Sequence, residues 1–453
     1  MNLPNYFLAD LPSGTALTPT VIMDACQTLK KNRENYLATR STQSLIRILS
    51  GIAKNWLEPD DAFRQETLRH GPAATGFSSE TLATGLDSFF EQITADNLQA
   101  LVIQEFGDVQ RLDTLSSTPS EQKTNHASFV RGPELIAHIT GGSIPNPVLT
   151  SIIFGLLTRS AQFVKCASGT SFVPRMFAHS IYEAEPKLGA CLEIADWKGG
   201  NETLETALYS EINALTATGS DETLEAIRRR LPPKVRLIGY GDRVSFAFVA
   251  HEVLSGMNPH RIISRAACDI VAWNQLGCLS PHVIYVETGG KISSEQFAEM
   301  LAKELDSIEQ QQPRGPLSTE ESAAIAYRRS FYEVRAAHSL DTKLWSSSGS
   351  TAWTVVFEND PRFQMSCLNR FIYVKAVGNL RQALEGADDV RAKVSTVGIA
   401  ATEDRAQKIA NELAQWGATR ICPLGQMQNP PLRWRHDGRP ALGDLVTWTD
   451  WEM

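Results

Sequence analysis

Several features that mark common protein classes are missing from this 453-residue chain. It has no run of about 18 uncharged apolar residues, which a membrane-spanning helix requires. Residues 1–14 lack the basic and apolar regions of a secretory signal peptide. The net charge is −8, and the mixed acidic and basic residues leave no basic stripe for nucleic acid. We therefore expect a soluble cytoplasmic protein that binds no nucleic acid.

Cysteine and histidine are too scattered to indicate a metal site or a disulfide framework. The seven cysteines form no CxxC pair, and the nine histidines form no HExxH motif or cluster at metal-ligand spacing. An odd number of dispersed cysteines is typical of reduced thiols in an intracellular protein. We predict that the protein binds no metal.

The pattern changes near residue 134, from mainly helical spacing to short apolar strands that alternate with amphipathic helices. Such alternation predicts mainly parallel β-sheet with helices on both faces. The chain is long enough for two large domains and an appendage. Strands are expected at LIAHIT, QFVKCAS, ACLEIADW, INALTATG, KVRLIGYG, STVGIAA and ATRICPL.

Cys278 has the sequence context of a nucleophile. Gly277 permits unusual backbone angles and close approach of a ligand, Pro281 removes a hydrogen-bond donor, and Asn274 and Gln275 are polar. A thiolate held against backbone amides attacks carbonyl carbon strongly, because local dipoles lower its pKa. Most isolated cysteines are small buried hydrophobes. That interpretation stays open, although the local context favours catalysis.

Two further segments are candidates for nucleotide binding. Lys165 ends an expected strand near the loop GGSIPNP, and ligands of open α/β sheets bind beyond the carboxyl ends of strands. Gly219 and Ser220 begin a well-capped helix whose N-terminus could accept a pyrophosphate. Each segment also has an ordinary structural interpretation, as a solvated surface lysine and as a normal helix start.

In this order, these segments resemble the LuxC-type acyl-CoA reductases, a fatty-acyl reductase family of the aldehyde dehydrogenase superfamily. The resemblance runs from about residue 134 to the end of the chain. Its motifs are GGSIPNPVLTSI, KCASG, TGSDETLEAIRRRLP, GYGDRVSFAF, QLGCLSPHVIYVE, LNRFIYVK and CPLGQMQNPPLRWRHDGRPALGDLVTW.

The resemblance implies an aldehyde dehydrogenase-like α/β fold. Residues 1–247 would hold an N-terminal helical region and a Rossmann-like NADP(H)-binding domain, and residues 248–428 the catalytic domain. Residues 429–453 would return to the cofactor domain and join a small oligomerisation element. We therefore expect a homo-oligomer.

The resemblance also assigns roles to individual residues. Cys278 falls on the catalytic nucleophile, Lys165 on the lysine that meets the adenosine ribose, and Gly219 and Ser220 on the helix start at the pyrophosphate. Relatives that prefer NAD carry an acidic residue three positions after the lysine. Here that position is Ser168, which leaves room for a 2′-phosphate. We expect NADPH as the cofactor, with NADH as the alternative.

The implied reaction is the reduction of an acyl thioester, carried by CoA or a carrier protein, to an aldehyde through an acyl-enzyme on Cys278. Asp242 is the only acid in GYGDRVSFAF, the region where hydrolytic relatives place a glutamate base. Many relatives have an asparagine near the oxyanion, and Ser143 stands there in this chain. The Ser143 hydroxyl can still donate one hydrogen bond, so either Ser143 takes the place of the asparagine, a backbone amide stabilises the oxyanion, or the enzyme is slow. Leu224 replaces the second glycine of many cofactor loops.

Two other functions stay open at this point. A CoA-dependent or hydrolytic aldehyde dehydrogenase would use the same thiol and differ in whether CoA or water accepts the acyl group. A weakly active scaffold would shelter acyl groups for an acyl-transferring partner enzyme. Ser143 at the oxyanion position keeps the scaffold hypothesis open, and the nucleophile loop argues against it.

Overall fold

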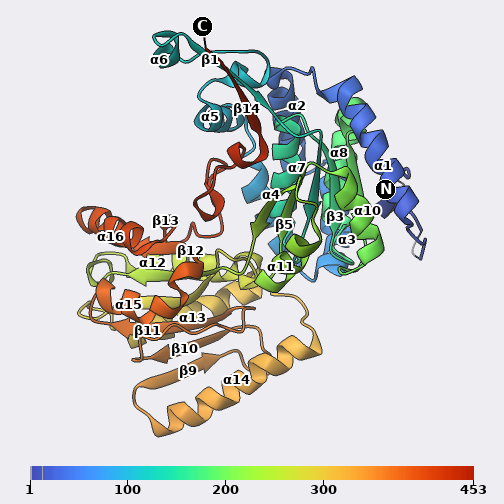
Figure 1. Cartoon of the computed structure of the whole chain (residues 1–453). Helices are drawn as coiled ribbons and strands as arrows, with labels where there is room; N and C mark the ends of the chain where they lie inside the picture. Colours follow the sequence, from blue (N-terminus) through green and yellow to red (C-terminus); the bar gives the residue numbers. More distant parts are fainter. Residues whose placement is uncertain (1–2, 13, 453) are drawn as a thin grey trace.

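The computed structural model describes residues 3–12 and 14–452 and contains two large sheets and a two-stranded ribbon (Figure 1). The first sheet is parallel throughout and has the order β4–β3–β2–β5–β6. Its strands are β2 (Leu135–Ile139), β3 (Ala161–Cys166), β4 (Leu192–Asp196), β5 (Ala214–Thr218) and β6 (Arg236–Tyr240). All five were expected from the sequence.

The second sheet has seven strands in the order β13–β12–β7–β8–β11–β10–β9, and only β9 runs antiparallel to its neighbour. The predicted domain boundary between residues 247 and 248 lies inside β7, because residues 244–249 form one continuously buried strand. The second sheet therefore starts a few residues earlier than expected. Its strands are β7 (Val244–Val249), β8 (Pro281–Glu287), β9 (Thr342–Ser346), β10 (Thr354–Glu358), β11 (Phe371–Val377), β12 (Val394–Ala400) and β13 (Arg420–Pro423).

Helices cover both faces of the five-stranded sheet. Successive strand residues point to opposite sides, so the strands bury apolar side chains on both faces. Ile136, Val164 and Ile194 face one core, which α2, α4, α5, α7 and α8 also line. Ala137 and Phe163 face the other core, beneath α1, α10 and α11. The N-terminal helices are α1 (Pro19–Asn32), α2 (Thr42–Leu57), α3 (Ala62–Thr75), α4 (Ser79–Phe90), α5 (Ala95–Phe106) and α6 (Pro119–Gln122). Those of the first sheet are α7 (Asn146–Leu157), α8 (Phe172–Ala184), α9 (Pro186–Gly189), α10 (Glu202–Glu211) and α11 (Asp221–Arg230).

The helices of the second lobe are α12 (Pro259–Val271), α13 (Ser294–Gln311), α14 (Thr319–His338), α15 (Leu380–Gly386) and α16 (Glu403–Trp416). Within residues 3–12 and 14–452, no helix combines the length and the apolar character that a bilayer crossing requires.

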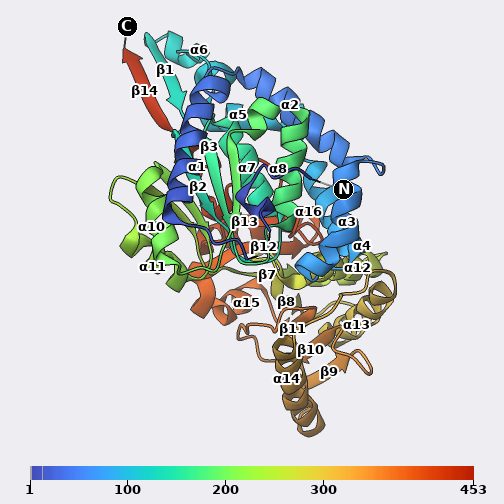
Figure 2. The ribbon, with the colours of Figure 1, turned by 90° about the vertical axis from the view of Figure 1, so that its right-hand side faces the viewer.

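The C-terminal segment returns from the second sheet to the first. Arg236 Nη1 at the start of β6 donates to the carbonyl oxygens of Asp444 and Val446, at 3.0 and 2.9 Å. The chain then ends in β14 (Thr447–Glu452), which pairs antiparallel with β1 (His126–Arg131). Figure 2 shows this ribbon projecting from the first lobe.

The carboxyl edge of the five-stranded sheet faces the amino edge of the seven-stranded sheet. Asp221, which begins α11 just after β5, forms an ion pair of 2.9 Å with Lys393, which directly precedes β12. Ile144, in the loop after β2, packs in one apolar cluster with Trp273 and Leu276, which precede β8. These contacts bring the loops of both sheets into one shared region.

Candidate active site

Cys278 lies on a loop between a short 3-10 helix (Ala272–Gln275) and β8. It is exposed, as is Cys268 among the other cysteines. Ser245 Oγ in β7 donates to the Cys278 carbonyl oxygen at 2.8 Å, and the Ser280 amide donates to the Gly277 carbonyl oxygen at 2.9 Å. These hydrogen bonds hold the backbone of Cys278 at the amino edge of the sheet, and the residue is partly open to solvent.

Two turns in the left-handed region of backbone space support the loop of residues 276–280, which we call the nucleophile loop after the role predicted for Cys278. Residues 273–275 have φ values of 51°, 51° and 64°, and residues 368–370 have φ values of 58°, 54° and 64°. None of these six residues is glycine, so each turn stores conformational strain. Such strain persists only where surrounding contacts fix the conformation. Nothing in the sequence pattern had indicated either turn.

Buried hydrogen bonds join the two left-handed turns. Arg370 Nη2 donates to Asn274 Oδ1 at 3.0 Å, and Gln275 Nε2 donates to the carbonyl oxygens of Phe371 and Pro281, at 2.9 and 2.7 Å. Asn274 and Gln275, which the sequence marked only as polar neighbours of the thiol, are thus buried structural groups. They fix the chain just before Cys278.

Gly277 has a different role from the one expected. Its φ is not positive, so it supplies no left-handed conformation. A Cβ atom at this position would lie only 2.5 Å from Gln428 Nε2, and that same nitrogen donates to Ser280 Oγ. The absence of a side chain at Gly277 makes room for Gln428. Asp269 holds the turn that carries Gln428, because its carboxylate accepts the amides of Gly425 and Met427.

The expectation of a lowered pKa at Cys278 is wrong. Although solvent reaches part of the residue, dense protein around the thiol removes water and raises its pKa to about 11. The negative charge of Asp437 adds to this rise, whereas Arg243 and Arg420 oppose it. The free enzyme therefore holds a neutral thiol near pH 7, and attack on a carbonyl requires removal of a proton.

Ser143 is exposed in the loop between β2 and α7. It follows Gly142, whose φ of 77° requires glycine. Ile144 and Leu276 both pack against the cluster of Phe77, Leu82 and Trp273, which places this loop in the same region as the nucleophile loop. Among the described residues the Ser143 hydroxyl forms no hydrogen bond, so it is free to donate to a ligand.

Lys165 is not a solvated surface residue: it is only 3% exposed, at the carboxyl end of β3. Burial lowers its pKa, and the charges of Glu205 and Asp196 oppose this shift without forming an ion pair with Lys165 among the described residues. Its Nζ lies 5.7 Å from the centre of the Trp197 ring, whose buried Nε1 has no hydrogen-bond partner. A buried cation beside an unused donor suits an anionic or hydroxyl-bearing ligand. Ser168 is exposed in the turn that follows.

Gly219 and Ser220 lead into α11 as predicted, and Ser220 Oγ accepts the Thr223 amide at 3.2 Å. The first amide of the helix is already used, however, because the Asp221 amide donates to Asp242 Oδ2 at 3.2 Å. A pyrophosphate at this helix start would replace the Asp242 carboxylate. The pyrophosphate position thus fits a nucleotide less directly than the Lys165 position does.

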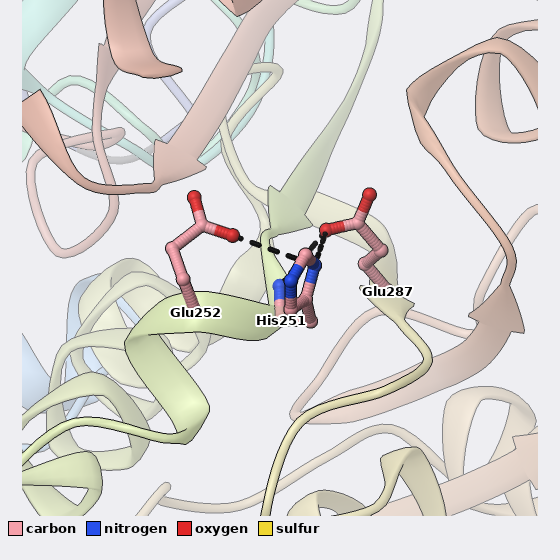
Figure 3. Close-up of side chains that lie close together, drawn as sticks. All are labelled: His251, Glu252 and Glu287. Atoms are coloured by element: carbon pink, nitrogen blue, oxygen red, sulfur yellow. Dashed lines mark hydrogen bonds and ion pairs between the residues drawn. The ribbon is translucent and has the colours of Figure 1, made fainter. Parts of the chain in front are cut away.

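A second charged cluster lies at the opposite, carboxyl edge of the seven-stranded sheet (Figure 3). His251 Nδ1 lies 2.6 Å from Glu287 Oε2 and 3.5 Å from Glu252 Oε2, a spacing that metal ligands could adopt. The Arg405 guanidinium already donates to both oxygens of Glu287 and to Glu252. We interpret the cluster as an ion-pair network.

Known proteins resemble this chain over most of its length. A family model described as Acyl-CoA reductase (LuxC) matches residues 37–448, so the match begins well before residue 134. The long-chain acyl-protein thioester reductase of Photorhabdus laumondii is 23% identical over 90% of this chain and 82% of its own length. The protein of that name from Aliivibrio fischeri is 24% identical, and the match covers 70% of this chain but only 63% of the relative.

Solved structures show the fold. A NAD-dependent benzaldehyde dehydrogenase from Corynebacterium glutamicum superposes with a TM-score of 0.68 at 13% identity, over 96% of this chain and 91% of its own. A bifunctional proline utilization A protein gives a TM-score of 0.71 at 16% identity, over 98% of this chain and 46% of its own. The predicted aldehyde dehydrogenase-like fold is confirmed.

Proposed function

Because this chain belongs to the acyl-CoA reductase (LuxC) family, we propose that it reduces an acyl thioester to an aldehyde through an acyl-enzyme on Cys278. One observation carries the proposal. Cys278 is exposed at the junction of the two sheets, on a loop that the turns at 273–275 and 368–370 hold in place. Fixed geometry of this kind favours a nucleophile over a packed structural thiol.

The residues around Cys278 support attack on a thioester carbonyl. The sulfur forms a bond to the carbonyl carbon, and negative charge develops on the carbonyl oxygen. Ser143, whose hydroxyl is free, and backbone amides of the nucleophile loop are the donors available to this oxyanion. Collapse of the tetrahedral intermediate breaks the bond to the leaving thiol and leaves the acyl group on Cys278.

We infer that NADPH is the reductant, with NADH as the alternative. Lys165 would hold the adenosine ribose and its phosphate, Ser168 leaves space that an acidic side chain would fill, and Gly219 and Ser220 would lie at the pyrophosphate. The buried, unpaired Lys165 supports the first of these roles. A bound nicotinamide supplies the hydride that converts the acyl group to the aldehyde.

The acyl group is also a proposal. The relatives are named for long-chain acyl-protein thioesters. We propose a long-chain acyl group for this chain as well, carried by CoA or by a carrier protein.

The test is incubation with a panel of acyl-CoA thioesters, from short to long chains, followed by intact-protein mass spectrometry and by NADPH oxidation. Wild-type protein should gain one acyl group, and Cys278→Ala should gain none and lose at least about 10³-fold in reduction rate. Cys268→Ala is the matched control, because it removes the other exposed thiol. Equal acylation of wild type and Cys278→Ala would refute the assignment.

A further inference from the structure

Helix α14 carries large apolar side chains on its solvent-facing side. Tyr327 is 78% exposed, Phe331 51% and Val334 62%. Successive steps of four and three residues place the three side chains on one face of the helix. Leu340, two residues beyond the helix, is 87% exposed. Single exposed apolar residues are common in soluble proteins, but a contiguous apolar patch marks an interaction surface.

The opposite face of α14 is fixed to the seven-stranded sheet. Ile325 and Tyr332 pack in the buried core on one face of that sheet. Arg329 Nε donates to Thr354 Oγ1 of β10 at 2.9 Å. Figure 1 shows α14 beside β9, at the end of the second lobe. The exposed apolar side chains therefore project from a rigid support, and no described segment covers them.

The exposed face of α14 has the spacing of a coiled-coil contact. Six exposed positions follow one another at alternating steps of four and three residues, and we call them the α14 row: Glu320, Ala324, Tyr327, Phe331, Val334 and His338. Coiled coils place their a and d positions at this spacing, and those positions face the partner helix. The four central members are apolar and the two end members are polar, so the α14 row is suited to pack against a second helix.

The α14 row is complementary to itself when two copies of the helix run antiparallel. A two-fold axis midway between Tyr327 and Phe331 places Tyr327 of one copy opposite Phe331 of the other. The same axis places Ala324 opposite Val334, so a small side chain meets a larger one. Packed helices fill the space between them by interdigitation of this kind.

The charges at the two ends of α14 also favour the antiparallel arrangement. The first turn holds Glu320 and Glu321, and the last turn holds Arg335 and His338. Antiparallel pairing places the acidic end of each helix beside the basic end of the other, with Glu320 opposite His338. It also sets the positive end of each helix dipole beside the negative end of the other, whereas parallel pairing would bring like charges together.

This face is separate from the segment at which the family resemblance predicts oligomerisation. That segment, residues 429–453, ends in β14, and Figures 1 and 2 show β14 and α14 at opposite ends of the molecule. None of the six residues of the α14 row belongs to the candidate active site. An interface at α14 is therefore independent of the proposed reaction.

We propose that α14 forms an interface between two copies of this chain, packed antiparallel about a two-fold axis. A two-fold contact uses the same patch on both copies, as the self-complementary α14 row requires. Tyr327 and Phe331 form the centre of the contact, where aromatic side chains contribute most to association. Their burial removes from water the apolar patch that a single chain leaves exposed.

The test is the mass of the full chain in solution, measured by sedimentation velocity from about 0.1 to 50 μM. Phe331→Glu places a carboxylate at the centre of an apolar contact and should weaken association through α14 by at least about 100-fold. Wild type should then have twice the mass of the variant, whether or not the chain also assembles through residues 429–453. Tyr327→Glu, at a more exposed position, should have the same effect and guards against misfolding of the first variant.

The matched control is Met257→Glu, which adds the same charge at a fully exposed apolar residue outside α14. It should assemble as wild type does. Thermal unfolding and acylation of Cys278 report on the fold of each variant, and Tyr327→Glu should leave both unchanged.

Disulfide cross-linking tests the antiparallel register. All cross-linking variants carry Cys367→Ser, because Cys367 Sγ lies 4.0 Å from the carbonyl oxygen of Ala324. A mixture of Ala324→Cys and Val334→Cys chains should form a disulfide between these two positions, identified by peptide mapping. Neither chain should cross-link to itself at these positions, because residues 324 and 334 lie about 15 Å apart along a helix, and disulfides join Cα atoms less than about 7 Å apart.

Each outcome decides the proposal. Loss of assembly in both α14 variants, together with cross-linking of the mixture alone, supports it. Monomeric wild type, or assembly that the α14 variants do not change, overturns it. Cross-linking of either chain to itself at these positions, or no cross-linking of the mixture, overturns the antiparallel register. Flotation of monomeric wild type with phosphatidylglycerol vesicles, lost in Tyr327→Glu, would assign the face to a membrane surface and overturn the proposal as well.

Discussion

The candidate site residues of the two sheets lie at opposite ends of the strands. In the five-stranded sheet, Ser143, Lys165 and Ser220 all follow or end parallel strands at the carboxyl edge. In the seven-stranded sheet, Cys278 precedes β8 and therefore lies at the amino edge. Under the proposed assignments, the rule that ligands bind beyond the carboxyl ends of strands would describe the first sheet and not the second.

The difference follows from how the sheets face each other. The carboxyl edge of the first sheet lies against the amino edge of the second, as the Asp221–Lys393 ion pair shows. The residues proposed for the nucleotide and the proposed nucleophile therefore lie on the two edges that meet at this junction. The ion-pair network around Glu287 and Arg405 lies at the carboxyl edge of the second sheet, away from this junction. The position of an active site depends on where two sheets meet as well as on strand direction.

The largest effect should come from Arg370→Met. This substitution tests whether the two joined left-handed turns hold Cys278 in place at the amino edge of the second sheet. Arg370 is fully buried, pairs with Glu309 at 2.7 Å and binds Asn274. Its loss leaves buried polar groups unpaired, so unfolding free energy should fall by about 3 kcal/mol or more. Acylation of Cys278 should also slow at least about tenfold, because the loop loses its support. Urea unfolding and single-turnover acylation measure both.

Arg381→Met is the control for this substitution. Arg381 forms a surface pair with Glu385, and its side chain is 85% exposed, so the change should cost at most about 0.5 kcal/mol. If Arg370→Met lost stability but acylated at the wild-type rate, the left-handed turns would have no part in positioning the thiol.

Sequence patterns predicted the five strands of the first sheet and β12 and β13 of the second, because these strands depend on local apolar spacing. The local context of Cys278 favoured an exposed residue, and the position of Ser143 near the reacting thiol was expected only from the family resemblance. The patterns did not predict that the Gln428 side chain packs against Gly277, because 148 residues separate Gln428 from its hydrogen-bond partner Ser280. The predicted lowering of the Cys278 pKa was wrong for the same reason. It depends on the density of the surroundings and on Asp437, which only the folded chain brings near Cys278.

Glu287→Gln should lower stability without changing acylation. It therefore tests whether the carboxyl edge of the second sheet takes any part in the reaction. Burial by itself would raise the pKa of Glu287, but hydrogen bonds from Arg405 and His251 outweigh it and hold the pKa at about 2. Because this pKa lies below the value of an unfolded glutamate, the stabilisation is present above about pH 5 and is lost as pH falls toward 2. At pH 7 the free energy of unfolding of the variant should fall by on the order of 2 kcal/mol. This is less than the loss expected for a fully buried ion pair, because Arg405 is about one-third exposed.

Acylation by Glu287→Gln should match that of wild type, and its stability should depend less on pH below about pH 5 than that of wild type. Glu385→Gln removes a glutamate from an exposed pair and should change neither quantity. Slower acylation by Glu287→Gln, at a temperature where the protein is folded, would mean that the carboxyl edge of the second sheet contributes to the reaction after all.

The smallest effect should come from Ser168→Glu, which tests whether the carboxyl edge of the first sheet holds the nucleotide. A carboxylate at this exposed position, three residues after the buried Lys165, would repel a 2′-phosphate and accept hydrogen bonds from ribose hydroxyls. The ratio of NADPH to NADH affinity should fall about tenfold, or about 1.4 kcal/mol, as measured by fluorescence titration of each cofactor. Ser210→Glu adds the same charge at an exposed position of α10 and should leave the ratio unchanged. An unchanged ratio in Ser168→Glu would mean that the ribose binds elsewhere. The carboxyl edge of the first sheet would then have no proposed nucleotide site.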